Sequence, residues 1–502
     1  MPTRYLQFPL LKPAMLAAGL AAMLAVACAP LPATGPKPMP RPPESVAAAQ
    51  SLPGSAEGAW PDERWWQAYG DAQLDALIAE GMASSPDVAA AAARLRRAGG
   101  LAQQAGAARL PSVDVNGQAN AEKQSYNNGF PKEFLPQGWQ DTGQLAASLG
   151  FDLDLWGRNR AALAAATSEK RAAAIDARQA HLMLATAIAS AYVDLARLFE
   201  ERDVRQGELD TRTATQRLVA QRQANGLETR GSLRQSDSQA AAARAALAAA
   251  DQAIAVRRNQ IAALVGAGPD RGLALARPAL IRPALSGPAS GGLPEGVTTD
   301  LVGRRPDIAA ARARVEAAAS RIKVARADFF PAIRLNALVG VQSLGLENLF
   351  AGGSSYGRAG PAISLPIFHG GALQGRYRAE RASYDEAVAD YDRTVLAAYQ
   401  QAADAVSGRR LLAEQLARSA EALAAAEDAY AVAQSRYRGG LSSYLDVLTV
   451  EDRLLQARLA HASVAAAARA IDIDLVRALG GGFAPAAAFA PAANSAKDAP
   501  NG

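Results

Sequence analysis

The chain has 502 residues and a formal net charge of +5, with 50% hydrophobic but only 6% aromatic residues. Much of the hydrophobic share is alanine, which forms helices well but contributes little to a core, so the composition favours long, closely packed helices over a thick globular interior. The positive charge is small for this length and the arginines are interleaved with acidic residues, which gives no support for nucleic-acid binding.

The amino terminus has the order of an export signal. Basic residues precede an apolar run, residues 14–27, that is too short to span a bilayer, and Cys28 follows as the only cysteine of the chain. The sequence LAVAC, residues 24–28, resembles a bacterial lipoprotein box, in which the cysteine is lipidated and becomes the first residue. Ala29 replaces the aspartate that marks retention in the inner membrane, so we expect the outer membrane. The alternative is an ordinary signal with an incidental cysteine.

The segment after Cys28 is rich in proline and has no apolar periodicity. We therefore expect residues 1–27 to be a lipoprotein signal peptide and residues 28–58 to be an extended, lipidated tether. A single cysteine excludes an internal disulfide.

A tryptophan cluster precedes the first predicted long element. Trp60, Trp65 and Trp66 are interpreted as packing anchors, because no ionisable group is gathered with them for ligand binding. A helix is predicted to begin at Pro86 and to stop before Pro111.

Four stretches alternate apolar and polar side chains with the period of a β-strand, and they cover about residues 112–120, 143–154, 332–342 and 357–368. Each is about ten residues long, the length that a tilted strand needs to cross a bilayer. Four strands cannot close a membrane barrel, and an open edge is not tolerated in lipid, so a membrane-spanning sheet requires several chains. The alternative is a soluble sheet with one wet face.

Long helix pairs follow each pair of strands. The first pair is predicted at residues 158–225 and 229–265 with a turn at Gly226, and the second at 371–438 and 443–479 with a turn at Gly439 and Gly440. The first helix would measure roughly 100 Å at 1.5 Å per residue. Helices of this length are expected to pack side by side through their alanines.

The two halves of the chain are copies of one another. Pro86 matches Pro306 at an offset of 220 residues (306 − 86), whereas Gly226 matches Gly440 at an offset of 214 (440 − 226). We place the six-residue slip in the loop between the strands. The expected organisation is therefore a first repeat at 59–266, a linker at 267–300, a second repeat at 301–482 and a disordered tail at 483–502.

No catalytic, cofactor or metal-binding pattern is present. His181, His369 and His461 stand apart from one another and from helix-spaced acids, and no nucleophile elbow or phosphate loop occurs. We expect a protein that is not an enzyme.

Several segments belong together as a set. They are RRPDI (304–308), ARADFFPAIRLN (325–336), FDLDLWGRNRA (151–161), SLPIFHGG (364–371) and RYRGGLSSYLDVLTVEDRLLQARL (436–459). As a set they resemble the TolC and OprM-type outer-membrane efflux factors, in particular the lipoprotein branch that is paired with resistance-nodulation-division pumps. The resemblance runs from about Trp60 to Gly482.

The resemblance implies a mixed α and β membrane protein. Three chains of four strands each would form a twelve-stranded outer-membrane β-barrel, continuous with a long periplasmic α-helical barrel. Drugs or other small toxic compounds would leave through this homotrimer, which a periplasmic adaptor (a membrane fusion protein) joins to an inner-membrane pump of the resistance-nodulation-division class. The alternatives are a type I protein-secretion duct and, more distantly, a lipid-anchored periplasmic adaptor or structural coiled-coil protein.

In that family the hairpin tips form the periplasmic gate and the adaptor-docking surface. Carried over by position, these functions fall on the turns Gly226–Leu227 and Gly440–Leu441 and, at the constriction, on Leu445, with Tyr444 as a further gate or tip candidate. The acidic residue expected one helical turn later is replaced by Thr449, which leaves Asp446, Glu451 and Asp452 as candidates for an acidic ring. The alternative for Tyr444 and Leu445 is simple interhelical packing.

Overall fold

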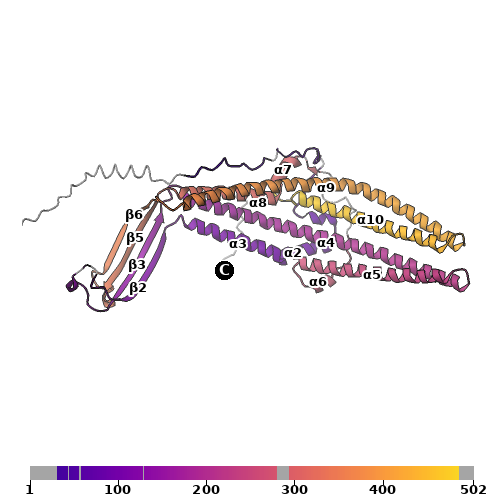
Figure 1. Cartoon of the computed structure of the whole chain (residues 1–502), viewed down its shortest axis with the longest axis horizontal. Coiled ribbons are helices and arrows are strands. Elements are labelled where there is room, and N and C mark those ends of the chain that lie inside the picture. Colours follow the sequence, from indigo (N-terminus) through magenta and orange to yellow (C-terminus); the bar gives the residue numbers. More distant parts are fainter. Residues whose placement is uncertain are drawn as a thin grey trace, which may run out of the picture. The chain divides into compact units, whose positions relative to one another are not determined.

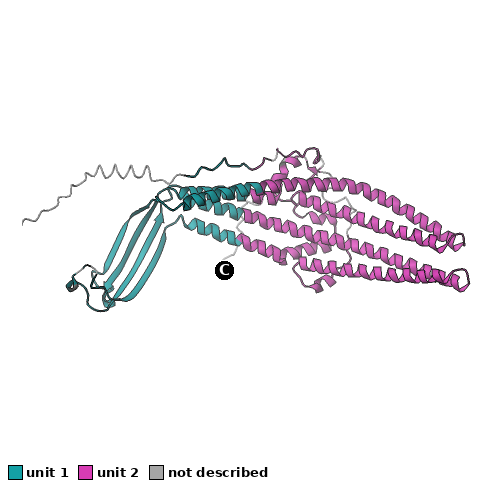
Figure 2. Cartoon of the chain, in the orientation of Figure 1, with its two compact units in different colours: residues 1–39, 96–171, 313–389 teal, residues 40–95, 172–312, 390–502 magenta. Residues whose placement is uncertain are grey.

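The computed structural model describes residues 31–42, 45–55, 58–127, 129, 131–279, 293–294 and 296–484. The expected signal peptide, Cys28, much of the expected linker and the tail from residue 485 lie outside the described residues. The chain divides into two compact units (Figure 2). Unit 1 comprises residues 1–39, 96–171 and 313–389, and unit 2 comprises residues 40–95, 172–312 and 390–502.

The two halves repeat one order of elements, a helix, a pair of strands and a pair of long helices (Figure 1). The first half contains β1 (Gly54–Ser55), η2 (Trp65–Tyr69), α2 (Ala72–Ser84), α3 (Pro86–Ala107), β2 (Ser112–Glu122), η3 (Lys132–Phe134), β3 (Gln140–Asp152), α4 (Arg158–Ala224), α5 (Arg230–Leu264) and α6 (Pro269–Leu273). The second half contains β4 (Leu293–Pro294), α7 (Val297–Arg304), α8 (Pro306–Ala327), β5 (Ala332–Leu344), η4 (Leu346–Asn348), β6 (Ser355–Ser364), α9 (Ala372–Arg438) and α10 (Tyr444–Ala478).

The six-residue slip lies between the paired strands of the two halves. The helices α3 and α8 and the strands β2 and β5 begin at an offset of 220 residues, whereas α4 and α9, and α5 and α10, begin at an offset of 214 (372 − 158 and 444 − 230). The segment that joins β2 to β3 spans residues 123–139, and its counterpart between β5 and β6 spans only 345–354. The shorter second loop therefore accounts for the change of register.

Unit 1 contains a four-stranded antiparallel sheet in the order β2-β3-β5-β6 (Figure 1). β2 and β6 are the edge strands, so each pairs with a neighbour along one side only. Pro361 lies within β6, opposite Leu335 of β5. An edge strand accommodates proline because one of its sides needs no ladder hydrogen bond from the missing N–H.

The register places apolar side chains of all four strands on one face of the sheet. Val113 lies opposite Leu149, and Ala147 lies opposite Val339. Most of the larger members of this face are exposed to solvent in the single chain, namely Val113, Val115, Leu145, Leu149, Leu335, Val339 and Ile363, whereas Phe151, Ile333 and Val341 are half-buried. Partners on the other face are polar, among them Gln118–Gln144, Gln144–Gln342 and Asp152–Arg334. A sheet of this kind needs an apolar environment on one face and water on the other.

The four predicted strands are wrong by two to four residues at one or both ends, and the two strands that were predicted to run too far end early for a local reason. The strand predicted at 357–368 ends at Ser364, because Pro366 follows and supplies no N–H for a ladder. The strand predicted at 143–154 ends at Asp152, since the Asp154 carboxylate accepts the backbone N–H groups of Asn159 and Arg160 at 2.9 Å each and so caps the start of α4.

Unit 2 has its apolar core where α2 meets the middle of α4 and the ends of α5 and α10. Leu77, Ile188 and Ile261 are fully buried in this cluster. The Tyr192 hydroxyl donates to the Asp71 carboxylate at 2.8 Å, and the same carboxylate caps α2. One stretch of α4 is apolar enough by composition to cross a membrane, but 67% of it is buried inside the protein, as in a core helix.

The expected linker and tether contain some regular structure where they are described. α6 and the start of α7 fall within residues 267–300, and the two-residue strand β4 pairs in parallel with β1, which lies in the expected tether. Tether residues also contact α9 in unit 1, where Arg381 donates to the carbonyls of Gly35 and Pro36 at 3.1 and 3.2 Å.

Candidate functional site

Two helix hairpins of unit 2 end in the same turn (Figure 1). The glycine after each long helix, Gly226 or Gly440, has a φ of +74°. The next residue then donates its N–H at 2.8 Å to the carbonyl five positions back, in the pairs Leu227–Arg222 and Leu441–Arg436. Only glycine adopts this left-handed conformation without a steric cost, so the turn explains both glycines.

Gly439, the other predicted turn residue, has no positive φ. It donates its N–H to the Ser435 carbonyl at 3.1 Å and so continues the hydrogen bonding of α9. The conformational requirement for glycine at this tip therefore rests on Gly440 alone.

Each hairpin restarts from a hydroxyl cap. The Thr229 hydroxyl accepts the Ser232 N–H at 3.0 Å at the start of α5. At the start of α10, Ser443 and Asp446 form a reciprocal capping box, in which the Asp446 carboxylate accepts the Ser443 N–H at 2.9 Å. This backbone hydrogen bond is the main reason why the pKa of Asp446 lies below its usual value. The carboxylate is therefore engaged in the cap.

Three leucines at the tips remain exposed. Leu227 and Leu441 follow the turn glycines and are 65% and 73% exposed, and Leu445 on the first turn of α10 is 62% exposed. Thr449 lies one turn after Leu445, is also exposed, and donates its hydroxyl to the Leu445 carbonyl at 2.9 Å. Along this side of α10, apolar Leu445 is followed one turn later by the neutral hydroxyl of Thr449, where the family would have a carboxylate.

Tyr444, the residue before Leu445, is buried. It belongs to a small apolar cluster that joins the two hairpins, whose buried members are Val219, Tyr437, Tyr444, Val447 and Leu448. Tyr444 therefore packs between helices, which was the alternative considered for both residues, whereas Leu445 is exposed.

Tyr437 connects the two tips through polar contacts. Its hydroxyl donates to Glu228 of the first hairpin at 3.0 Å, and the guanidinium of Arg222 lies 4.9 Å from the centre of its ring. Burial, followed by the hydrogen bond to Glu228, raises the pKa of Tyr437 well above its usual value, so this hydroxyl stays protonated. The pair fixes the end of α9 against the first turn.

A buried ionic cluster lies further along the same helices. Arg212 of α4 is 3% exposed at its side chain, lies 3.2 Å from the Glu451 carboxylate, and also pairs with Asp452. The Glu451 oxygens make no hydrogen bond of good geometry. Desolvation raises the pKa of Glu451 to about 7, an effect that the nearby Arg212 opposes and that Asp452 and Glu208 increase. Glu451 thus changes charge near neutral pH.

Arg212, Arg222 and Glu228 were not among the residues that sequence reasoning singled out. Arg212 lies 240 residues from Asp452, and Glu228 lies 209 residues from Tyr437. No local spacing relates such distant residues, although the alignment of the two turns could have paired the segments that contain them.

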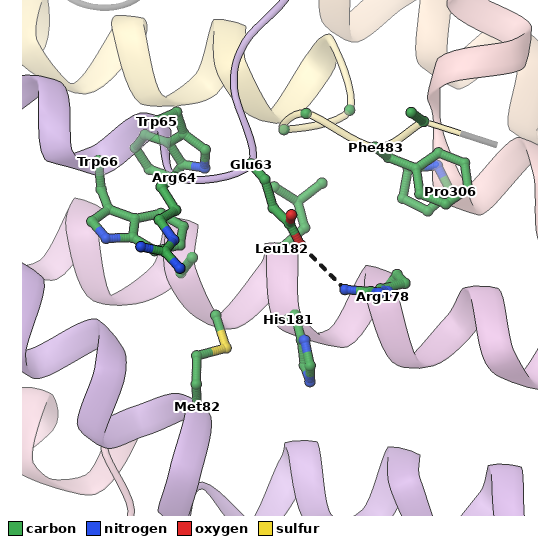
Figure 3. Close-up of a pocket in the computed structure, with 15 residues that line it drawn as sticks. Glu63, Arg64, Trp65, Trp66, Met82, Arg178, His181, Leu182, Pro306 and Phe483 are labelled. Carbon is green, nitrogen blue, oxygen red and sulfur yellow. Dashed lines mark hydrogen bonds and ion pairs between the residues drawn. The ribbon is translucent and has the colours of Figure 1, made fainter. Parts of the chain in front are cut away.

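Trp65 and Trp66 of the tryptophan cluster line a cavity of about 310 Å³ in unit 2 (Figure 3). Trp65 is buried and stacks edge-to-face on Trp66 with ring centres 5.8 Å apart. Contrary to the sequence interpretation, ionisable residues do accompany the tryptophans, since Glu63 pairs with Arg178 at 3.2 Å beside His181 and Arg304 lies 4.8 Å from the Trp60 ring centre. Glu63 and Arg178 neutralise each other and Arg304 stacks on a ring, so these contacts are those of helices packed together. Among the described residues, no group of acidic, histidine or cysteine side chains could hold a metal ion.

Comparison with known proteins gives one consistent result. The family profile described as "Outer membrane efflux protein" matches residues 77–267 and 298–481. The chain is 29% identical to the multidrug resistance outer membrane protein MdtP of Escherichia coli (strain K12) over 88% of this chain and 90% of MdtP. It is 35% identical to the fusaric acid resistance protein FusA of Burkholderia cepacia over 65% of this chain, a match that spans less than two thirds of FusA (61%).

The structural comparison agrees. The crystal structure of the outer membrane protein VceC from Vibrio cholerae superposes with a TM-score of 0.78 and 41% sequence identity. The match covers 84% of this chain and the whole of the VceC chain (100%).

Proposed function

The chain belongs to the outer membrane efflux protein family, and we propose that three copies of it form the exit duct of a tripartite efflux system. The protein is an outer-membrane efflux channel that extends into the periplasm. The trimer, the barrel, the gate and the lipid anchor belong to the proposal, and each is supported by a separate feature of the chain.

The sheet is the observation that carries the proposal. Most large side chains of its apolar face are exposed in one chain, and its edge strands β2 and β6 each lack a partner on one side among the described residues. Pairing β6 of one copy with β2 of the next would satisfy both edges, and three copies of four strands give a barrel of twelve. The apolar side chains then face lipid and the polar face lines the duct.

The hairpin tips are proposed as the periplasmic gate and the adaptor-docking surface. Exposed Leu227 and Leu441 suit docking, because they present apolar side chains at the two equivalent turns. Exposed Leu445 suits the constriction, since a ring of apolar side chains can close a pore by excluding water. Glu451 is buried and Asp452 is ion-paired with Arg212, so an acidic ring is better assigned to Asp446, whose carboxylate caps α10 but is at the surface and forms no ion pair with any residue that the structure describes.

The cargo is proposed to be drugs or other small toxic compounds. The relatives are named for multidrug resistance, fusaric acid resistance and, in Pseudomonas putida, pyoverdine export. In the proposal an inner-membrane pump of the resistance-nodulation-division class supplies the energy, and a periplasmic adaptor joins it to this duct. Cys28 is the proposed site of the lipid anchor.

Deletion of the gene in its native host tests the function. We expect a panel of dyes and antibiotics to accumulate in the deletion strain, and the plasmid-borne gene to restore export. A deletion strain that exports the panel normally but no longer secretes a protein into the medium would instead identify a protein-secretion duct.

A further inference from the structure

Unit 1 has an open groove where its sheet meets its helices. The groove has a volume of about 660 Å³ and lies between the start of α4 and the end of α8. Its walls include the aromatic side chains Trp156 and Phe330 and the cations Arg160, Lys323 and Arg326. It lies beneath β3 and β5, the two middle strands of the sheet, because β3 leads into α4 and α8 leads into β5.

The central position matters for access. In the proposed trimer, neighbouring copies pair with the edge strands β2 and β6, so the region beneath β3 and β5 stays within one chain. The groove would then open at the periplasmic end of the barrel, beside the membrane surface. A role for the groove at that surface rests on the proposed function.

The cations of the groove are poorly neutralised. Lys323 and Arg326 are exposed, and neither forms an ion pair within the described part of the chain. Arg160 contacts the Asp154 carboxylate at 3.2 Å, so one of the three positive charges has an acidic partner. Two uncompensated charges on adjacent turns of α8 attract an anion.

The tether adds a further cation to the same surface. Lys37 lies 5.6 Å from the ring centre of Tyr384, whose hydroxyl donates to the Pro38 carbonyl at 3.1 Å. Burial lowers the pKa of Lys37 first, and the positive charges of Arg381, Lys323 and Arg326 lower it further. Asp385 lies 3.7 Å from Arg381 and offsets part of this repulsion. Lys37 therefore lies within electrostatic reach of Lys323 and Arg326, and these cations repel one another.

A second cavity at the same junction has cations that are paired with carboxylates, unlike Lys323 and Arg326 in the groove. It has a volume of about 350 Å³ and receives Asp152 and Arg334 from the polar face of the sheet. Its cations Arg158 and Arg376 both pair with Asp328, at 2.7 and 2.8 Å. The cavity that adjoins the polar face is therefore internally neutralised, whereas the groove between α4 and α8 is not.

The aromatic wall has the chemistry of a membrane–water boundary. Trp156 stacks on Phe330 with ring centres 4.7 Å apart, donates its indole N–H to the Pro331 carbonyl at 2.8 Å, and is 52% exposed. Tryptophan is enriched at the headgroup level because its ring is apolar and its N–H is polar. Lys323 precedes Phe330 by seven residues (330 − 323), roughly 10 Å at the rise of a helix, so the cations lie close to this aromatic wall.

We propose that this groove binds the headgroup of an anionic phospholipid from the leaflet that faces the periplasm. Lys323 and Arg326 would contact the phosphate, Trp156 and Phe330 would contact the glycerol region, and the acyl chains would continue along the apolar face of the sheet. One lipid per protomer would seal the junction between the barrel and the helices.

Native mass spectrometry of the full-length protein in detergent tests this inference. The probes are palmitoyl-oleoyl phosphatidylglycerol and, as the zwitterionic match with the same acyl chains, palmitoyl-oleoyl phosphatidylcholine. We expect the wild type to retain the anionic lipid preferentially, one molecule per protomer. The variant Lys323→Gln/Arg326→Gln is expected to bind it about 20-fold more weakly, because two surface cations are lost.

The matched control is Arg96→Gln/Arg97→Gln, which removes the same charge from two exposed arginines of α3 in unit 1 and should retain the lipid normally.

Unchanged phosphatidylglycerol binding by the α8 variant, or equal binding of both lipids by the wild type, would contradict the inference. So would displacement by millimolar glycerol phosphate, which would indicate a site for free anions. The same spectra report the assembly, so a wild-type monomer counts against the proposed duct, whereas a trimer without lipid preference counts only against the groove.

Discussion

Gly226 and Gly440 occupy the same position in two hairpins that are 214 residues apart in the chain (440 − 226), and both have a φ of +74°. The leucine after each donates its N–H to the carbonyl five residues back at 2.8 Å. The two tips of the helix hairpins are therefore built alike, down to the backbone hydrogen bonds. They differ at the start of the returning helix, because only the second tip continues into the capping box of Ser443 and Asp446.

The turn predicts a difference between neighbouring glycines. Gly440→Ala should destabilise the second tip by about 1–2 kcal/mol, because alanine pays a steric cost in the left-handed conformation. Gly439→Ala, its matched control, should be close to neutral, since Gly439 has no positive φ and a methyl group at this position would meet only ordinary contacts, the nearest at 3.6 Å. Hydrogen exchange at residues 436–446 measures the effect, and equal protection in both variants would contradict the turn assignment.

Leu445 is predicted to form the constriction. Leu445→Ala should raise single-channel conductance in planar bilayers by about twofold or more, because a smaller apolar side chain excludes water less well. Leu411→Ala removes another exposed leucine, from the side of α9, and serves as the control. A conductance that stays at the wild-type value in Leu445→Ala would remove this residue from the gate.

The two faces of the sheet are predicted to respond differently to charge. Val115→Arg should abolish most outer-membrane assembly, because an arginine on a lipid face costs about 2–4 kcal/mol near the bilayer midplane. Asn116→Arg places the same side chain on the polar face, where it should be tolerated. Quantifying assembled protein in outer-membrane fractions separates the two, and equal assembly of both variants would argue against a lipid-facing surface.

The raised pKa of Glu451 predicts that the stability of the contact between α4 and α10 depends on pH. An acid whose pKa is raised on folding, here to about 7, favours the folded state at low pH, and this contribution is lost as pH rises from about 4.3 to about 7. The contact between α4 and α10 should therefore loosen between pH 5.5 and 8, by at least about tenfold in its opening equilibrium.

Glu451→Gln should remove that dependence, because the amide stays neutral throughout. Hydrogen exchange of residues 444–456, corrected for the intrinsic effect of pH, is the measurement. Asp452→Asn is the control, since Asp452 is half-exposed and its loss leaves Glu451 in place. If wild type and Glu451→Gln open equally at both pH values, the ionisation of Glu451 has no part in holding these helices together.

Sequence reasoning located the regular elements because their periods are local. The ends of α4, α5, α9 and α10 differ from the predicted helix ends by at most one residue, since glycine turns and hydroxyl caps mark them in the sequence. The strands were found by their alternation, but β6 ends early at Pro366 and β3 ends early at the Asp154 cap. Those two errors arise where a turn or cap competes with an alternation that continues past it.

The tip contacts could not be obtained in the same way. Glu451 and Asp452 were candidates for an acidic ring in the sequence, and only the folded chain pairs both of them with Arg212. Tyr437 and Glu228 come from different hairpins, so their hydrogen bond depends on how the two repeats pack. Leu445 and Tyr444 are adjacent in the chain, yet burial assigns packing to one and exposure to the other.

The native mass of the membrane-extracted, mature protein in detergent is the decisive measurement for the trimeric duct. We expect a trimer, with an added lipid mass on each chain at Cys28, because four strands with two open edges require further copies to close a barrel in lipid. A stable monomer that stays soluble without detergent would contradict the duct, since its apolar sheet face would then have no membrane to cover it.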